Sequence, residues 1–323
     1  MKVKLSNSSV DKYNECSLCY NLHYNKGIRP VKTGSALIFG GIIDKALNEL
    51  LLTKDLHKAL LLFNNEWNKV ENSQLIKYSK SDLDKELLDY YLGLDGKNNP
   101  EWKTLQIKGQ LFIEAYNLEV LPKIKKVIAV QEPITIKNAD NDEITGFLDL
   151  IVEWEDGKTY LMDNKTSSVQ YSETAAKDNQ QLPLYYYATK DKYKLDGIGY
   201  IILSKKINKN KVKKCKLCGF LNETQHKTCN ELVDVSVQGD GQFERCNGEF
   251  DITINPTVDI QYIFNQVEEL DIDRVIETFD NVNYCISNEI FATEHNPIRG
   301  KYGWCPFKDY YENSPDFIKL EKK

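Results

Sequence analysis

Apolar residues recur at helical spacing through the first third of the chain. Between about residues 34 and 72 they fall every three or four positions, as in Ile43, Ala46, Leu47 and Leu50. Spacing of this kind is typical of an amphipathic helix with one face on the core. A cap signal at Ser81 opens a further helical stretch, and helical character continues to about residue 116. The pattern therefore predicts a helical N-terminal third.

The pattern changes to strands in the middle of the chain. Apolar and β-branched residues cluster in short runs, at residues 125–136, 144–154 and 158–165. The last two runs meet at Asp156-Gly157, which is a strong signal for a hairpin turn. We therefore predict a β-hairpin here, with a further strand before it.

Helical and extended patterns alternate in the remainder of the chain. We predict a helix over residues 172–190, with Pro183 in its first turn or at a kink. Strands are expected at residues 197–206 and 248–257, and a helix at residues 259–288. This order of elements predicts an α/β fold with a mixed central sheet flanked by helices.

Composition and charge set the broad class of the protein. Of the 323 residues, 41% are hydrophobic and 28% are charged, which is typical of a globular chain. No run of about 18 apolar residues and no signal-peptide core occurs, so we expect a cytoplasmic protein with no membrane partner. In such a compartment the eight cysteines are expected as thiols or metal ligands. The net charge of −6 argues against a uniformly basic coat but leaves a local basic groove open.

The predicted hairpin carries three ionisable residues inside apolar runs. Asp149 and Asp163 lie on neighbouring strands, and Lys165 follows on the same face as Asp163. Two buried carboxylates repel each other unless a cation lies between them, so the pair predicts an oxygen-rich site for Mg²⁺ or Mn²⁺. Beside it, an ammonium group can hold an attacking water or neutralise a phosphoryl oxygen. The alternative is a surface hairpin with an Asp–Lys ion pair, but the apolar neighbours argue for burial.

A wider motif surrounds this hairpin. Gly146-x-x-Asp149 is followed by Asp163-Asn164-Lys165-Thr166 and then by Gln181-x-x-x-Tyr185. Through these motifs the chain resembles the PD-(D/E)XK nuclease superfamily over about residues 30–205. It resembles in particular the RecB-like branch, which includes phage exonucleases and CRISPR-adaptation nucleases. The resemblance implies a restriction-endonuclease-like core in which Asn164 offers its backbone carbonyl to the metal. It also implies that Gln181 and Tyr185 position the DNA strand or the lysine. The alternative for these two is a helix that only packs its apolar residues into the core.

Two further acidic residues match positions of the family. Asp44 stands where the first helix of the family commonly carries a metal-binding histidine, and it would favour magnesium or manganese. A solvated aspartate beside the apolar stripe is the alternative. Glu132 stands where the preceding strand often carries an acidic residue, so the resemblance makes it a candidate outer ligand.

A second group of candidate metal ligands follows. Cys215-x-x-Cys218-Gly219 is typical of a zinc knuckle, with Cys229 and Cys246 as the expected third and fourth ligands and His226 as a substitute for either. Seven lysines lie between residues 205 and 216. This run predicts either a solvated face or a surface that follows a phosphate backbone. We expect residues 1–204 to hold the N-terminal helices and nuclease core, 205–250 a structural-zinc insert, and 251–323 the C-terminal strand and helices that complete the core.

The other four cysteines raise the question of a cluster. Some relatives in the RecB-like branch join their termini through an iron–sulfur cluster, and the flanks of Cys16, Cys19, Cys285 and Cys305 are similar. The C-terminal trio of cysteines is missing, however, so buried free thiols are expected in place of an iron–sulfur cluster.

These features lead to one functional hypothesis and two rivals. We expect a divalent-metal-dependent DNA exonuclease that acts on single- or double-stranded DNA in phage or bacterial recombination, repair or processing, with recombination or replication proteins as partners. The expected location is the cytoplasm of a bacterial or phage-infected host cell. One rival is a non-catalytic nucleic-acid-binding or assembly protein that uses the zinc module and the lysines, and the other is an RNA-directed nuclease. The sequence has no P-loop, G-x-G-x-x-G or G-x-S-x-G motif to anchor helicase, dehydrogenase or esterase chemistry.

Overall fold

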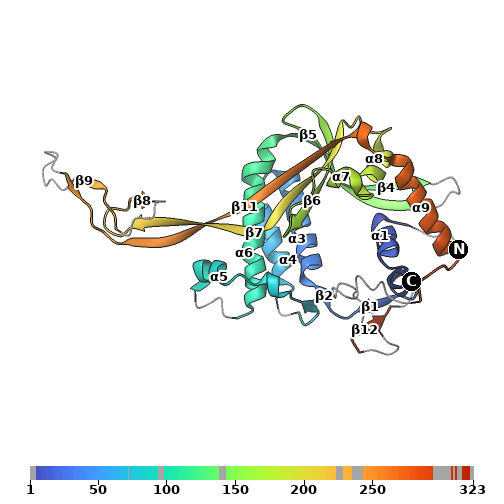
Figure 1. Ribbon diagram of the computed structural model, residues 1–323, viewed down its shortest axis with the longest axis horizontal. Coiled ribbons are helices and arrows are strands. Elements are labelled where there is room, and N and C mark those ends of the chain that lie inside the picture. The colour runs from blue at the N-terminus through green and yellow to red at the C-terminus, as the bar shows by residue number, and fades with distance from the viewer. Residues whose placement is uncertain are drawn as a thin grey trace.

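A mixed β-sheet forms the centre of the computed structural model (Figure 1). Its strands are β4 (Ile124–Lys137), β5 (Glu143–Trp154), β6 (Thr159–Ser167), β7 (Gly197–Cys215), β8 (Leu221–Asn222) and β11 (Phe250–Gln266). The main order is β11-β7-β6-β5-β4, and β8 pairs with the outer part of β7. β6 and β7 run parallel, whereas the other neighbours are antiparallel. The structure describes residues 5–71, 73–93, 98–137, 143–222, 228–234, 243–293, 307, 310 and 315–320.

One face of this sheet is covered by helices from the N-terminal third. They are α3 (Ser35–Thr53), α4 (Leu56–Asn68), α5 (Lys85–Leu92) and α6 (Pro100–Ala115). Asp55 and Asp84 start α4 and α5 by accepting hydrogen bonds from backbone N–H groups three residues on. α4 and α6 approach closely because Gly109 leaves room for the ring of Phe63, which a Cβ atom would meet at 2.0 Å. Together these helices and the sheet bury the larger hydrophobic cluster of the molecule.

The opposite face of the sheet is covered by shorter helices. They are α1 (Asn7–Glu15), α7 (Ala175–Asp178), α8 (Gln181–Thr189) and α9 (Ile272–Ser287). A second cluster of buried apolar residues joins α1, α8 and α9 to β5, β6 and β7. Pro183 lies in the first turn of α8, where its missing N–H leaves no helical hydrogen bond unmade. The predicted mixed α/β fold with a central sheet flanked by helices is thus confirmed.

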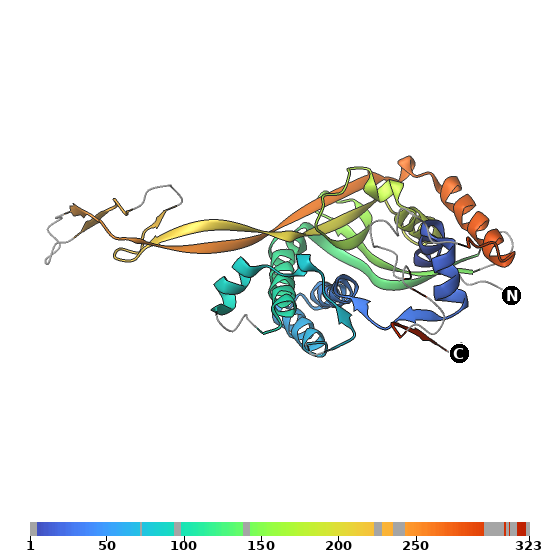
Figure 2. The ribbon, with the colours of Figure 1, turned by 60° about the horizontal axis from the view of Figure 1, so that its bottom comes forward.

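The two longest strands extend far beyond the rest of the sheet. β7 and β11 pair without interruption from Cys215 and Phe250 down to Val258, and Figures 1 and 2 show them as a ribbon that projects from the core. The ribbon ends in a small tip, where β8 and the hairpin of β9 (Leu232–Asp234) and β10 (Phe243–Arg245) lie. The expected domain boundary at residues 204 and 205 therefore falls inside one continuous strand.

One predicted element was wrong. Residues 259–266, expected as the start of a helix, form the inner half of β11, and α9 begins only at Ile272. Here both faces of the strand are covered: Ile260, Tyr262 and Phe264 pack on the larger cluster and Ile263 on the smaller one. Apolar residues on both faces of a strand do not alternate with polar ones, so their pattern resembles that of a buried helix.

Short strands join the ends of the chain and brace the first long helix. β1 (Ile28–Pro30) pairs with β12 (Phe317–Lys319), so the two ends of the chain lie close together (Figure 1). β2 (Thr33–Gly34) pairs with β3 (Ile76–Lys77) just before α3. Among the described helices, none is both long and apolar enough to cross a membrane.

Candidate metal sites

The first candidate site lies where two strands of the sheet separate. β5 and β6 pair from Glu153–Thr159 to Leu150–Met162, and the next residues, Asp149 and Asp163, face the opening between them. A pocket of about 350 Å³ forms there. Its polar lining residues are Asp44, Asp149, Asp163, Asn164, Lys165 and Thr166. Because the pairing of β5 with β6 ends here, the carboxylates of Asp149 and Asp163 on these adjacent strands line one cavity.

Asp163 is the most deeply buried carboxylate of this pocket, and it contacts the partly exposed Lys165. The Asp163 side chain is 2% exposed and forms an ion pair with the Lys165 ammonium group. Burial raises the pKa of Asp163 well above its ordinary value, and the nearby Asp149 carboxylate raises it further against the opposing charge of Lys165. Burial by itself would lower the pKa of Lys165, but Asp163 and Asp149 outweigh it and raise that pKa. The lysine is therefore held in its charged form.

Asp44 reaches the same pocket from α3 and is tied to Asp149 by Gln131. The Gln131 amide donates to Asp149 Oδ1 at 3.1 Å and to Asp44 Oδ2 at 3.2 Å. Asn48 donates a further hydrogen bond to Asp44. Burial, followed by the charge of Asp149, raises the pKa of Asp44 to about 6. One neutral amide thus bridges two carboxylates that would otherwise repel each other.

Gln131 has an unusual backbone conformation for a strand residue. Its φ of 49° lies in the left-handed region, which costs a non-glycine residue about 1 kcal/mol or more. β4 and β5 pair on either side of it, at Val130–Leu150 and Glu132–Leu148, so Gln131 stands opposite Asp149. The strained residue is the one whose side chain holds the carboxylates.

Gln181 and Tyr185 occupy one face of α8, and Tyr185 lies against the Gly146 motif. Burial, then the charge of Asp149, raises the pKa of Tyr185 to about 12, while a hydrogen bond with Gln181 works against the rise. A Cβ atom on Gly146 would meet Tyr185 Oη at 2.8 Å and its ring at 3.0 Å. The two sequence motifs are therefore coupled by steric contact, because only glycine leaves room for the tyrosine beside Asp149.

Two other predicted residues lie differently from the carboxylates. Glu132 takes part in an ion pair with Lys192 and accepts a hydrogen bond from Tyr193 at 2.5 Å. The structure thus does not bring Glu132 to the pocket. Asn164 lines the pocket, and its backbone pairs with Ile201 of β7. Its buried side-chain amide makes no hydrogen bond of normal geometry within the described residues.

The donor set of this pocket fits a divalent cation. Three carboxylates, Asp44, Asp149 and Asp163, line the pocket together with a single ammonium group. Burial and then the charge of Asp149 raise the pKa values of Asp44 and Asp163. Carboxylate and carbonyl oxygens are the ligands that Mg²⁺ and Mn²⁺ prefer. Additional positive charge would relieve the repulsion that now opposes ionisation.

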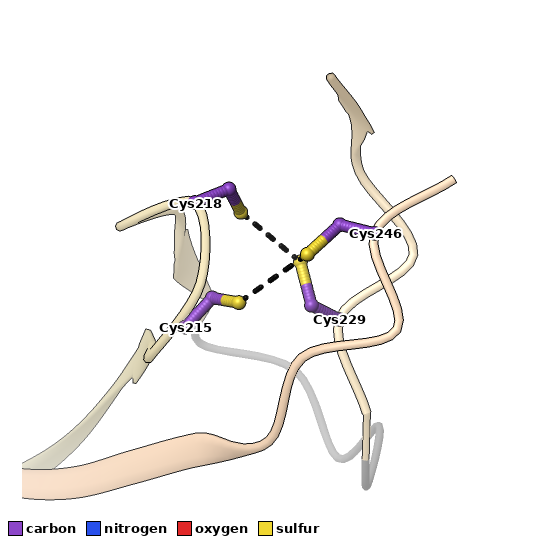
Figure 3. A group of neighbouring side chains, drawn as sticks. All are labelled: Cys215, Cys218, Cys229 and Cys246. Carbon is purple, nitrogen blue, oxygen red and sulfur yellow. Dashed lines mark hydrogen bonds between the residues drawn. The ribbon is translucent and has the colours of Figure 1, made fainter. Parts of the chain in front are cut away.

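The second candidate site is the cysteine cluster at the tip of the ribbon. The sulfurs of Cys215, Cys218, Cys229 and Cys246 all lie within 4.8 Å of one another, and Figure 3 shows them pointing to a common centre. The Cys215–Cys246 and Cys218–Cys229 sulfur distances are 3.5 and 3.6 Å. A tetrahedral zinc ion with Zn–S bonds of about 2.3 Å would set its sulfurs about 3.8 Å apart. The four predicted ligands therefore converge on a group that could hold a metal such as zinc, and His226 lies outside the described residues.

Backbone geometry favours the thiolate form of Cys215, whereas burial raises the pKa of Cys229 to about 12. Backbone N–H groups of Cys218 and Leu217 point at the Cys215 sulfur and lower the pKa of that thiol to about 6. Gly219 closes the turn with a φ of 74°. Gly248 approaches so closely that a Cβ atom there would lie 2.5 Å from Cys215 Sγ. The second half of the site thus has a tight Cys-x-Gly turn where a second C-x-x-C is missing from the sequence.

The remaining cysteines that the structure describes, Cys16, Cys19 and Cys285, do not join this cluster. Cys16 and Cys19, at the start of α2 (Ser17–Tyr20), are buried with Leu22, Ile28 and Phe307. Cys285 lies on α9 near the Tyr13 hydroxyl. The prediction for Cys305 falls outside the described residues.

Two residues near the pocket escaped the sequence analysis. Gln131 belongs to none of the motifs, and its only signal is an amide inside an otherwise apolar strand, one residue before Glu132. Asp11 of α1 lies close enough to Lys165 for the lysine charge to oppose the burial that raises the pKa of Asp11. No local spacing links residue 11 to residue 165, so only the packing of α1 on the sheet reveals this contact.

Comparison with known proteins agrees with the motifs. The family model of the PD-(D/E)XK nuclease superfamily matches residues 4–310. No curated protein matches the chain significantly. Among solved structures, the crystal structure of SSO0001 is similar at a TM-score of 0.31 and 12% identity, covering 82% of this chain and 96% of that chain. A structural likeness of that size places no individual residue.

Proposed function

Because this chain belongs to the PD-(D/E)XK nuclease superfamily, we propose that it is a deoxyribonuclease that depends on Mg²⁺ or Mn²⁺. The observation that carries the proposal is the buried ion pair of Asp163 and Lys165, which shares a pocket with Asp149 at the point where β5 and β6 separate. A purely structural ion pair would not need a second carboxylate beside it, because unpaired buried charge is destabilising.

Each residue of the pocket has a role in this proposal. Asp149, Asp163 and the backbone carbonyl of Asn164 would hold the cation, with Asp44 as a further ligand. A divalent cation held there would lower the pKa of an attacking water and neutralise charge on the scissile phosphate. The Lys165 ammonium group orients the water for in-line attack on the phosphodiester. Glu132 stays outside the ligand set because Lys192 and Tyr193 engage its carboxylate.

Gln131 has a positioning role in the same proposal. Its amide now lies between Asp44 and Asp149, which keeps both carboxylates turned toward the pocket before a cation binds. Within the described residues, the cysteines are the only set of three or more candidate ligands within 4.8 Å of one another, so the carboxylates stand further apart. Cation binding would therefore draw them inward and release at least one of the Gln131 hydrogen bonds.

The finer parts of the function follow from the resemblance. We propose exonucleolytic action on DNA in recombination, repair or processing, with Gln181 and Tyr185 shaping the substrate groove. The cysteine cluster would hold a structural zinc ion, because four protein ligands leave no open coordination position for chemistry.

Cleavage assays test the core of this proposal. End-labelled single- and double-stranded DNA and RNA are incubated with the protein in Mg²⁺, Mn²⁺ or EDTA. We expect DNA degradation in Mg²⁺ or Mn²⁺ and none in EDTA. Lys165→Ala is expected to lower the rate by at least about 10²- to 10³-fold, as for the loss of one strong transition-state contact.

Two further variants make the result interpretable. Lys126→Ala removes an exposed lysine of β4 outside the pocket and is expected to retain the wild-type rate. Lys165→Ala leaves Asp163 buried without its ion-pair partner, so this variant could fail to fold. Asp149→Asn provides a second test for that case. Tight DNA binding without cleavage in any metal would instead support the non-catalytic rival.

A further inference from the structure

A second, larger groove lies near the carboxylate pocket. Ser167 follows Lys165 by two residues on β6, so their side chains share one face of the sheet, and Ser167 and Ser204 line the groove. It has a volume of about 780 Å³. Its polar lining residues are Ser167, Ser168, Gln170, Ser204, Lys206, Asn208, Asp259 and Gln261. Along this face, the groove therefore lies between Lys165 of the candidate site and the root of the ribbon.

The walls of this groove are held in place by hydrogen bonds. Gln261 of β11 accepts from the backbone N–H of Tyr171 at 3.0 Å and donates to its carbonyl at 2.8 Å. This pair fastens the segment after β6 onto the sheet. Asn208 donates to Asp259 at 2.7 Å and so occupies the one carboxylate in the lining. Of the residues that line the groove, Lys206 is the only cation.

The groove continues the sheet face that carries the candidate site. Pairing of β6 with β7 aligns Lys165 with Ile202 and Ser167 with Ser204, so these side chains share one face. Lys206 and Asn208 continue that face onto the ribbon. Along the ribbon this face carries exposed amide and hydroxyl side chains in the cross-strand pairs Asn208–Thr257 and Asn210–Asn255, and at Thr253 opposite Val212. Exposed Lys214 lies near its end. We call this surface the open face of the ribbon.

The other face of the ribbon is packed against the core at its root. Ile207 and Val258 join the larger hydrophobic cluster. Lys209 forms ion pairs with Asp84 at 2.6 Å and with Glu86 at 3.3 Å. Within the described residues, the ammonium groups of Lys206 and Lys214 on the open face make no ion pair. Asp251 lies opposite Lys214, but its carboxylate forms an ion pair with Lys216. At the root of the ribbon, the open face is thus the side available to a ligand.

We propose that the groove and the open face form a track for the nucleic acid that extends away from the cleaved phosphodiester. The proposal rests on the nuclease function above and names the surface that binds the rest of the substrate. Hydroxyl, amide and lysine side chains supply most protein contacts to phosphate and sugar groups. A two-stranded β-ribbon has the width that the major groove of a duplex admits. The chemistry of the track therefore fits a nucleic-acid backbone.

The length of the ribbon sets the expected footprint. At about 3.3 Å per residue, the eleven steps from Ser204 to Cys215 span about 36 Å, which is about one helical turn of duplex. At the far end, Cys215 on β7 and Cys246 just before β11 belong to the cysteine cluster, so a metal there would hold the two strands together. Substrate should therefore gain affinity up to about one turn beyond the site and little thereafter.

A pair of charge-reversal variants on the same strand tests the track. Lys206→Glu alters the open face, while Lys211→Glu makes the same charge change at an exposed position on the opposite face. Binding of fluorescent duplexes of 8 and 20 base pairs is measured by anisotropy in EDTA, across a salt series. We expect wild-type protein to bind the longer duplex more tightly. Lys206→Glu should weaken that binding by about tenfold and reduce the salt slope by about one unit, the share of one phosphate contact, while Lys211→Glu stays within about twofold of wild type.

The outcomes separate the track from the nuclease proposal. Equal weakening by both variants, weakening by neither, or equal wild-type affinity for the two lengths overturns the track. Metal-dependent cleavage by the wild-type protein is measured in parallel. If cleavage occurs and the variants bind alike, the track alone fails; if cleavage never occurs, the nuclease proposal fails.

Discussion

The two candidate metal sites are built in opposite ways. At the tip of the ribbon, four cysteines from three short segments converge, all between Cys215 and Cys246. In the core, Asp44, Asp149 and Asp163 come from a helix and two strands that the whole sheet must bring together. The tip has soft sulfur ligands and the core has hard oxygen ligands, so the two sites select different ions.

The two sites differ in whether the metal or the hydrophobic core supplies the folding free energy. The apolar cluster of the tip consists of three buried cysteines packed against Cys218, Val233 and Phe250. Larger apolar residues there are exposed, as for Leu217 at 77% and Leu221 at 61%. The carboxylate pocket instead lies between two large hydrophobic clusters, and hydrogen bonds from Gln131 hold its ligands. A metal would fold the tip, whereas the core would fold first and then bind a metal.

The largest expected effect is that of losing a cysteine ligand, which tests whether the tip depends on a metal to fold. Cys229→Ser is expected to abolish zinc binding and unfold the tip, because structural zinc contributes most of the folding free energy of such small modules, about 10–16 kcal/mol for zinc-finger peptides. Metal analysis reports the zinc content, and hydrogen exchange reports the protection of residues 215–222 and 243–249. Protection in the core helices should not change.

A matched cysteine substitution serves as the control. Cys285→Ser changes a half-buried thiol on α9 outside the cluster, and it should leave both zinc content and tip protection as in the wild type. A Cys229→Ser protein whose tip keeps its protection would show that the tip folds without metal, and the contrast between the sites would then disappear.

A smaller effect tests how tightly the core holds its ligands. Gly146→Ala places a methyl group 2.8 Å from Tyr185 Oη, so either the tyrosine or β5 must shift. We expect a loss of about 1–3 kcal/mol in the free energy of unfolding, as for other overpacked interiors, together with slower cleavage. Denaturant titration measures the first effect.

The control for this prediction is another glycine-to-alanine change. Gly40 lies inside α3, and a Cβ atom there meets nothing within 4 Å. Gly40→Ala should therefore stabilise the protein by about 0.5–1 kcal/mol, since alanine favours the helix. If both variants had the same stability, Gly146 would not be a site of close contact.

The same contrast explains what the sequence could predict. The cysteine spacing is local, so the four ligands of the tip could be named from the sequence and are found together. In the core, short motifs placed Asp149, Asp163 and Lys165, whose distance along the chain is also small. Gln131 could not be found in this way, because its role depends on a left-handed backbone conformation and on a helix nearly ninety residues away. The position of Glu132 likewise depends on its contacts with Lys192 and Tyr193.

Fold prediction had a similar limit. Amphipathic helices were predicted correctly because one face of each is polar, and the hairpin was predicted correctly because Asp156-Gly157 marks its turn. The inner half of β11 was misread as helix because both of its faces are buried, and the long ribbon was not foreseen because its register is set by pairing between distant residues. Tertiary contacts, rather than local preference, decide these segments.

The most gradual expected effect concerns pH and asks whether the core site resists ionisation until a cation binds. Burial and Asp149 raise the pKa of Asp44 to about 6, above its unfolded value of 3.8. The stability that this group contributes is therefore complete below about pH 4 and is lost as pH rises through 6. Cation binding needs the ionised Asp44 carboxylate, so the share of Mn²⁺ affinity that Asp44 supplies should fall by up to about tenfold per pH unit below pH 6. Calorimetric titration at pH 5 and 7 measures this change, and Asp44→Asn should flatten it while raising metal-free stability at pH 7 by at most about 3 kcal/mol. A pH profile that is identical in the variant and the wild type would mean that Asp44 is not a ligand, and that two carboxylates with Lys165 suffice to bind the cation.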